Sequence, residues 1–305
     1  MSKYHEQVRI LLQVLPLVAT ENCFALKGGT AINFFIRDFP RLSVDIDLVY
    51  VPIEDRNTTL TNIDKALSNI SGKIKKLNFQ VSEKVIIEPI SKQSIITKLI
   101  VSNSGNLIKI EPNLTIRGTV YPIENKSLVK AVENKFGLFA EINTLSIHEL
   151  YAGKICAALD RQHPRDLFDI KLLFENEGIN EKIHKAFIVY LLSHNRPIHE
   201  LLNPNFKDIK DIFNKEFQGM TEMHITLDEL IETRQILKDK ILSRFTDKEK
   251  QFLLSFKKGV PEWDLLELPD IDKFPSIKWK LQNINSMPAK KQKEQLLKLE
   301  AVLNI

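Results

Sequence analysis

A pair of aspartates separated by one residue, Asp45 and Asp47, constrains this chain more than any other feature. They lie in the β-branched, apolar run from Val44 to Val51, which is typical of a buried strand. Residues two apart in a strand point to the same side, so both carboxylates are expected to share one small space while Ile46 and Leu48 enter the core. Such a pair is costly unless a cation neutralises it. The pattern therefore predicts a site for Mg²⁺, with Mn²⁺ as an alternative, completed by substrate phosphates.

A glycine turn precedes this strand and predicts the other half of a phosphate site. Gly28 and Gly29 let the backbone approach a ligand closely, and Thr30 adds a hydroxyl. The stretch from Thr30 to Ile36 has helical spacing, so its N-terminus is expected to point free amides at an anion. A pair of glycines or a pair of aspartates is common in ordinary turns and loops. With a helix between them, the two motifs together indicate phosphate and metal chemistry.

A third carboxylate is expected near the aspartates, and the sequence offers Glu111 and Glu88. Each follows an apolar run and precedes a proline, so the local pattern does not separate them. Glu111 is preferred because Lys109, two residues earlier, is expected on the same strand face, where it can help to bind phosphate. For Glu111, a solvated glutamate at a strand end is an equal alternative. Paired metals at such a site can activate an attacking hydroxyl and stabilise a leaving pyrophosphate.

The order of expected elements predicts an α+β protein with two domains. Up to residue 142, helices alternate with strands, which indicates a mixed β-sheet with flanking helices: helices at 6–20 and 57–77, and strands at 81–87, 95–101 and 107–116. From residue 143 to residue 305, strand signals fade and helices dominate. Ser146 and Glu149 form a capping box that opens the first of these helices, and Thr246 and Glu249 form another.

Four charged residues in the helical half form the second candidate cluster. Lys154 and Arg161 lie two turns apart on one face of a helix, and Asp166 and Asp169 share a face of the next helix, which begins at Pro164. The two cations can reach phosphates. Alternatively, all four residues form an interhelical salt-bridge network. The residues alone leave these two interpretations equal.

Composition narrows the class of protein without identifying it. The chain has 305 residues, of which 43% are hydrophobic and 27% charged, as in a globular protein. No apolar run reaches the roughly 18 residues that span a bilayer, and no signal peptide is recognisable, so a cytoplasmic protein without a membrane partner is expected. The net charge of +4 is compatible with nucleotides or nucleic acid but is weak support by itself. Cys23 and Cys156 have apolar neighbours and are expected to be buried thiols.

Three passages of the sequence resemble one protein family. The first joins Leu26–Ala31 to the pattern Arg41-x-Ser43-x-Asp45-Ile46-Asp47-Leu48, the second runs from Glu149-Leu150-x-Ala152-x-Lys154 through Arg161 to Asp169, and the third is the tail from Trp263 to Trp279. Together they resemble the AbiEii/AbiGii family of nucleotidyltransferase toxins, the toxic halves of type IV abortive-infection toxin–antitoxin pairs. The first passage is also similar to the wider polymerase-β-like nucleotidyltransferase superfamily.

The resemblance implies roles for most of these residues. Asp45 and Asp47 would hold Mg²⁺, with Glu111 as the third metal ligand, although the superfamily more commonly has aspartate there. Lys154 and Asp166 would complete the catalytic site from the helical domain. The residues expected to bind the nucleotide are Gly28, Gly29, Thr30, Ser43, Lys154 and Arg161.

The resemblance also implies an activity and partners. An NTP would donate a nucleoside monophosphate to an acceptor hydroxyl, with the 3′ end of tRNA as the expected acceptor. A cognate antitoxin with a winged-helix domain would restrain the toxin. The alternatives are the same chemistry on a small molecule or protein, and an inactive nucleotide-binding module.

Overall fold

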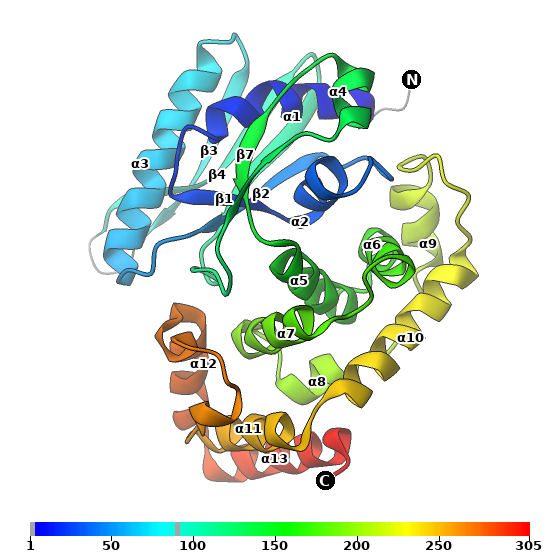
Figure 1. Cartoon of the computed structure of the whole chain (residues 1–305). Coiled ribbons are helices and arrows are strands. Elements are labelled where there is room, and N and C mark those ends of the chain that lie inside the picture. The colour runs from blue at the N-terminus through cyan, green and yellow to red at the C-terminus, as the bar shows by residue number, and fades with distance from the viewer. Residues whose placement is uncertain (1–3, 89–91) are drawn as a thin grey trace. The chain divides into compact units, whose positions relative to one another are not determined.

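A seven-stranded mixed β-sheet organises the N-terminal half of the chain (Figure 1). The computed structural model describes residues 4–88 and 92–305; residues 1–3, part of the N-terminus searched for a signal peptide, lie outside the described residues. The strand order is β3-β4-β5-β2-β1-β7-β6. The strands are β1 (Phe24–Lys27), β2 (Asp45–Tyr50), β3 (Gln80–Ile87), β4 (Ser94–Asn103), β5 (Asn106–Asn113), β6 (Glu124–Ser127) and β7 (Glu141–Thr144).

Two long helices cover one face of this sheet. Helix α1 (Tyr4–Val18) packs against β5 and β7, α3 (Arg56–Lys75) packs against β3 and β4, and the two helices contact each other. In β5, Ile108 and Ile110 are completely buried, whereas Lys109 and Glu111 are exposed. Because side chains alternate along a strand, these two charged residues point to the face opposite the buried isoleucines.

Strand β2 has the alternation that its sequence predicts. Ile46 and Leu48 are fully buried, while Asp45 and Asp47 are half-buried. Between β1 and β2 the expected helix is present in an unusual form. A single α-helical turn, α2 (Gly28–Ala31), continues as a π-helix, η1 (Ile32–Ile36), in which the wider turn is closed by the Arg37 N–H donating to the Ile32 carbonyl at 2.8 Å.

The remaining chain is mostly helical, so the predicted α+β class is confirmed. Two compact units are present: residues 1–150 with 219–224, and residues 151–218 with 225–305. Residues 219–224 belong to the first unit although the segments on both sides of them belong to the second. They are held there by the Leu42 N–H, which donates to the Met220 carbonyl at 2.7 Å. Helix α4 (Lys130–Phe136) belongs to the first unit, and α5 (Ile147–Asp160) begins at its end.

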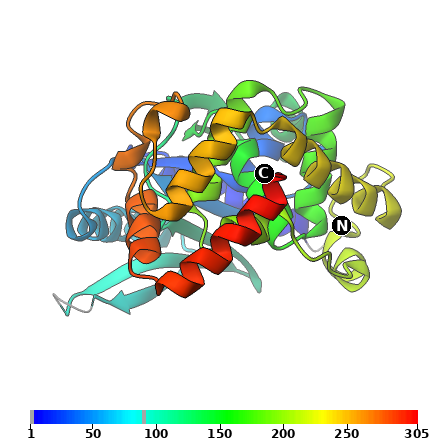
Figure 2. The same ribbon diagram turned by 90° about the horizontal axis from the view of Figure 1, so that it is seen from below.

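Helices and short helical turns build the second unit. Helices α11 and α13 pack side by side, seen in orange and red in Figure 2. Both predicted features of α6 and α11 are confirmed: Pro164 occupies the first turn of α6, and Thr246 and Glu249 cap α11 reciprocally. The elements are α6 (Pro164–Glu175), α7 (Glu181–Ser193), α8 (Ile198–Leu202), α9 (Lys210–Ile212), η2 (Phe213–Phe217), α10 (Leu227–Arg244), α11 (Asp247–Lys258), η3 (Trp263–Leu265), η4 (Ile271–Lys273), α12 (Pro275–Asn285) and α13 (Ala289–Leu303).

The two cysteines, both expected to be buried thiols, differ in exposure. Cys156 is buried, Cys23 is half-buried, and neither forms a disulfide. Trp263 packs on Phe252 of α11, with ring centroids 5.7 Å apart, whereas Trp279 of α12 is 57% exposed. None of the helices among residues 4–88 and 92–305 is long and apolar enough to cross a bilayer.

Candidate active site

The turn between β1 and α2 lies directly against β2. Gly28 has a left-handed backbone with φ of 76°, and a Cβ atom at this position would lie 2.6 Å from Oδ2 of Asp47. A Cβ atom on Gly29 would lie 2.6 Å from a terminal nitrogen of Arg41 and 3.1 Å from Oγ of Ser43. A side chain at Gly28 would need both a left-handed backbone and a shift of Asp47, so glycine is strongly favoured there; at Gly29 the Arg41 guanidinium would have to move.

Thr30 attaches the start of α2 to β2 and the residues before it. Its hydroxyl is buried and lies 2.9 Å from Oγ of Ser43 and 2.5 Å from the Asp45 carbonyl oxygen. One helical turn after Gly29, the side-chain amide of Asn33 donates a hydrogen bond to the Gly29 carbonyl at 2.8 Å. The polar groups of Thr30, Ser43 and Asn33 thus hold the glycine turn and the aspartate strand in a defined relative position.

Neighbouring strands place charged residues beside both aspartates. Asp47 lies opposite Lys27 on antiparallel β1 and opposite Glu111 on parallel β5. Asp45 lies opposite Lys109, two positions earlier in the ladder of β2 and β5. Because opposed residues point to the same face of a sheet, the carboxylates of Asp45, Asp47 and Glu111 and the two lysines share the face away from α1.

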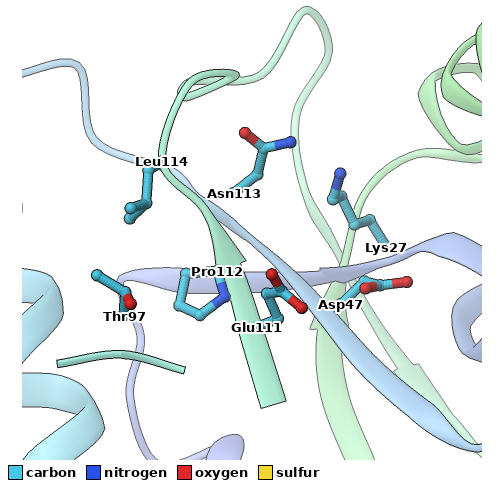
Figure 3. A pocket seen from close by; sticks show the side chains of 7 residues that line it. All are labelled: Lys27, Asp47, Thr97, Glu111, Pro112, Asn113 and Leu114. Carbon is cyan, nitrogen blue, oxygen red and sulfur yellow. The ribbon is translucent and has the colours of Figure 1, made fainter. Parts of the chain in front are cut away.

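This face contains a pocket of about 370 Å³ (Figure 3). Asp47 and Glu111 line it from adjacent strands, and Lys27 lines it from the end of β1. The remaining wall is formed by Thr97, Pro112, Asn113 and Leu114. The pocket therefore offers an ammonium group and two carboxylates, which suits a phosphorylated substrate accompanied by a cation.

The structure separates the two alternatives for the third carboxylate. Glu111 lies opposite Asp47, whereas Glu88 follows β3, the edge strand that β4 and β5 separate from β2. The Glu111 carboxylate already has a cationic partner, because Lys98 Nζ lies 2.7 Å from its Oε2. Within the described residues, no group of three histidine, cysteine or acidic side chains is arranged to hold a metal. The half-buried carboxylates of Asp45 and Asp47 still fit Mg²⁺, because this cation usually binds one or two protein carboxylates together with phosphates and water.

The four charged residues of the helical unit form an ion-pair network, one of the two interpretations that the sequence left open. Lys154 Nζ lies 2.8 Å from Oδ1 of Asp166 and 3.0 Å from Oδ2 of Asp169, and all three side chains are buried. Arg161 reaches the same Asp166 carboxylate with two nitrogens, at 2.5 Å and 2.9 Å. Burial acts to raise the pKa of the Asp166 carboxyl, but the charges of Lys154 and Arg161 outweigh burial and hold this pKa below its ordinary value.

Several residues around the pocket had no assigned role in the sequence interpretation. Lys27 and Asn113 line the pocket, and Lys98 is paired with Glu111. These positions follow from strand pairing or loop geometry, which local patterns do not show. Asn113 accepts hydrogen bonds from the backbone of Thr115 and Ile116, both at 2.9 Å, and so shapes the loop that closes one side of the pocket. Of these three residues, only Lys27 could have been recognised from the sequence, because it directly precedes Gly28 and Gly29.

Comparisons with known proteins agree with this geometry. Among solved structures, the fold is similar to MenT4, a nucleotidyltransferase toxin from Mycobacterium tuberculosis H37Rv, with a TM-score of 0.56 and 14% identity over 93% of this chain and 95% of MenT4. At this identity the likeness shows a shared fold. No curated protein matches the sequence. A family model described as the nucleotidyl transferase AbiEii toxin of type IV toxin–antitoxin systems matches residues 9–283. Since that match spans most of its length, the chain belongs to the AbiEii family of nucleotidyltransferase toxins.

Proposed function

We propose that this toxin transfers a nucleoside monophosphate from an Mg²⁺-bound NTP to a hydroxyl at the 3′ end of tRNA. The observation that supports this most directly is the packing of Gly28 against Asp47, which joins an anion-binding turn to a carboxylate that suits a metal. The proposal assigns residues 1–142 to the catalytic domain and residues 143–305 to a helical domain that contributes to substrate binding.

The proposed site would hold Mg²⁺ through Asp45 and Asp47, with Glu111 as a further candidate ligand. When bound, the cation neutralises phosphate charge and polarises the phosphorus to be attacked. The backbone of Gly28 and Gly29, together with Ser43 and Thr30, shapes the turn that receives the triphosphate. Lys27, the residue before this turn, lines the pocket beside Asp47.

The reaction itself requires little covalent chemistry from the protein. The acceptor oxygen forms a bond to the α-phosphorus of the NTP, the bond from this phosphorus to the β-phosphate oxygen breaks, and pyrophosphate leaves. The hydroxyl proton must go to a nearby base. Glu111 can accept it, because its carboxylate is 47% exposed beside Asp47 and would only need to release Lys98.

In the helical domain, we propose that Arg161 and Lys154 contact substrate phosphate and that Asp166 orients them. The Arg161 side chain is 60% exposed although it binds Asp166, so its charge remains accessible to an anion. Lys154 is held between Asp166 and Asp169, which sets the position of its ammonium group. Membership of a type IV family further supports a cognate antitoxin, which we propose carries a winged-helix domain.

Labelled nucleotides test the proposal. The purified protein is incubated with Mg²⁺, each α-³²P-labelled NTP, and total tRNA, total protein or a panel of hydroxyl-bearing small molecules. We expect label on tRNA, with an equal amount of pyrophosphate released, and loss of both signals in Asp45→Asn and Asp47→Asn. Asp38→Asn is the matched control, because Asp38 is exposed in the loop before β2.

The acceptor classes separate the proposal from its alternatives. Label on protein or a small molecule would keep the chemistry but replace the acceptor. Full transfer by Asp47→Asn would contradict the proposed catalytic centre, and so would the absence of pyrophosphate release with every acceptor class.

A further inference from the structure

Arg117 is a buried cation in the segment that follows β5. Only 6% of its surface is exposed. The next residue, Gly118, donates its N–H to the carbonyl of Tyr50 at 2.9 Å, so this segment is attached to the end of β2. Arg117 therefore lies at a defined place in the first unit, beyond the C-terminal ends of the two strands that carry Asp47 and Glu111.

The guanidinium of Arg117 has no partner in the part of the chain that the structure describes. It makes neither a hydrogen bond nor an ion pair there, and Nε is fully enclosed without an acceptor. The terminal nitrogens also lack an acceptor but are not fully enclosed, so they reach the molecular surface. A ligand from solution can therefore accept hydrogen bonds from the terminal nitrogens of Arg117.

The surroundings of Arg117 increase the cost of its charge. Burial lowers its pKa first, and the neighbouring charge of Arg56, the first residue of α3, lowers it further. The negative charges of Asp55 and Glu54 raise the pKa of Arg117, but both carboxylates already accept hydrogen bonds from other groups. Asp55 caps α3 by accepting from the backbone of the helix, and Glu54 accepts from the Tyr50 hydroxyl at 2.8 Å.

An enclosed guanidinium without an acceptor is rare in folded proteins, because an unpaired buried charge is strongly destabilising. Beside a second arginine, the group that removes this cost is an anion, and a planar guanidinium matches the oxygens of phosphate particularly well. We propose that Arg117, together with Arg56, binds a phosphate group of the substrate. This inference rests on the proposed transfer to a polynucleotide, whose acceptor supplies such groups.

The position of Arg117 favours an acceptor phosphodiester over the NTP triphosphate. Tyr50, to whose carbonyl the Arg117 segment is bonded, lies three residues beyond Asp47 on β2, or about 10 Å along the strand. The same segment begins at Asn113 and Leu114, which line the pocket beside Asp47. A polynucleotide that places its 3′ hydroxyl in the pocket can thus place a preceding phosphate near Arg117.

Binding measurements with one substrate at a time test this site without requiring catalysis. The full-length protein is titrated with a fluorescent single-stranded RNA in one arm and with each Mg²⁺-NTP in the other. The variants are Arg117→Gln, Arg117→Lys and Arg56→Gln. Arg244→Gln, which removes an exposed arginine at the end of α10, is the control. Each arm is repeated over a range of salt concentrations.

We expect Arg117→Gln to weaken RNA binding about 10-fold or more and to reduce the slope of log affinity against log salt concentration by about 1. Arg117→Lys should retain part of the affinity because it keeps the charge, and the control should match the wild type. Without ligand, Arg117→Gln should melt no lower than the wild type, since it removes an unpaired charge. If it does melt lower, Arg117→Lys provides the affinity comparison in a folded protein.

Each outcome decides the inference. Loss in the RNA arm assigns the site to the acceptor, and loss in the NTP arm alone assigns it to the triphosphate. Unchanged affinity of both Arg117 variants in both arms overturns the inference, even if labelled nucleotide is transferred normally. Conversely, RNA binding that depends on Arg117 in a protein that transfers no nucleotide would leave this site standing and overturn the proposed reaction.

Discussion

Gly28 and Asp47 are in such close contact that a methyl group on Gly28 would lie 2.6 Å from Oδ2 of Asp47. The left-handed φ of 76° at Gly28 brings its backbone to this carboxylate. The turn expected to receive phosphate and the strand expected to hold the metal therefore depend on each other sterically.

Gly28→Ala tests this dependence. The variant should lose roughly 1–2 kcal/mol of unfolding free energy from the left-handed backbone. Displacement of Asp47 should lower nucleotide transfer about 100-fold, as expected when a reacting group moves by about 1 Å. Gly105→Ala is the matched control: its φ is 81°, but no atom lies within 4 Å of the added Cβ. Urea unfolding and the labelled-NTP assay measure both quantities, and equal activities of the two variants would contradict the prediction.

Lys98 should compete with a divalent cation for Glu111. Its ammonium lies 2.7 Å from the Glu111 carboxylate, and both groups are partly exposed, so the ion pair contributes only about 0–1 kcal/mol. We expect Lys98→Met to lower the Mg²⁺ concentration at half-maximal transfer by about 2- to 5-fold, and Glu111→Gln to raise it. Lys84→Met, on the adjacent strand β3, is the control for loss of a positive charge. A shift that is the same in both lysine variants would exclude competition at Glu111.

Asp166 should make stability depend on acidity. The pKa of its carboxyl in the folded protein is below the ordinary value of about 3.9. Its contribution to the free energy of unfolding is therefore complete well above pH 4 and is lost as the pH falls from there toward the folded-state pKa. Asp166→Asn should cost about 3 kcal/mol at pH 7, because Lys154 and Arg161 lose a buried charged partner. The difference from the wild type should shrink steadily below pH 4 in urea unfolding experiments. Asp264→Asn, at an exposed carboxylate, should show no such trend.

Lys280 should make stability rise with pH as well, but in alkaline solution. Burial, and then the charge of Lys257, lowers the pKa of Lys280 from 10.5 to about 8. Between these values the folded protein binds fewer protons at this site than the unfolded chain, so the site contributes stability that rises with pH from 8 to 10.5. Lys280→Met should lack this rise, whereas Lys278→Met on the same helix should keep it. Parallel pH profiles for Lys280→Met and the wild type would refute the assignment.

The longer elements could be predicted because their signals are local. The alternation along β2 follows from side chains that point to opposite sides of a strand, and the caps of α6 and α11 follow from residue types within one helical turn. Strands β1, β6 and β7 could not be recognised in the same way. Each has four residues, too few to display a period, and each exists because a neighbouring strand pairs with it.

By itself, the sequence determined the α+β class, the pairing of Asp45 with Asp47 on one strand face and the glycine turn before them, since all three depend on neighbouring residues. Only the tertiary structure decided which glutamate stands beside Asp47, because Glu111 and Glu88 have similar local sequences and differ in the strand order that separates them. The same holds for Arg117. Its importance lies in being buried without an acceptor, a property that arises from residues distant along the chain and has no local pattern.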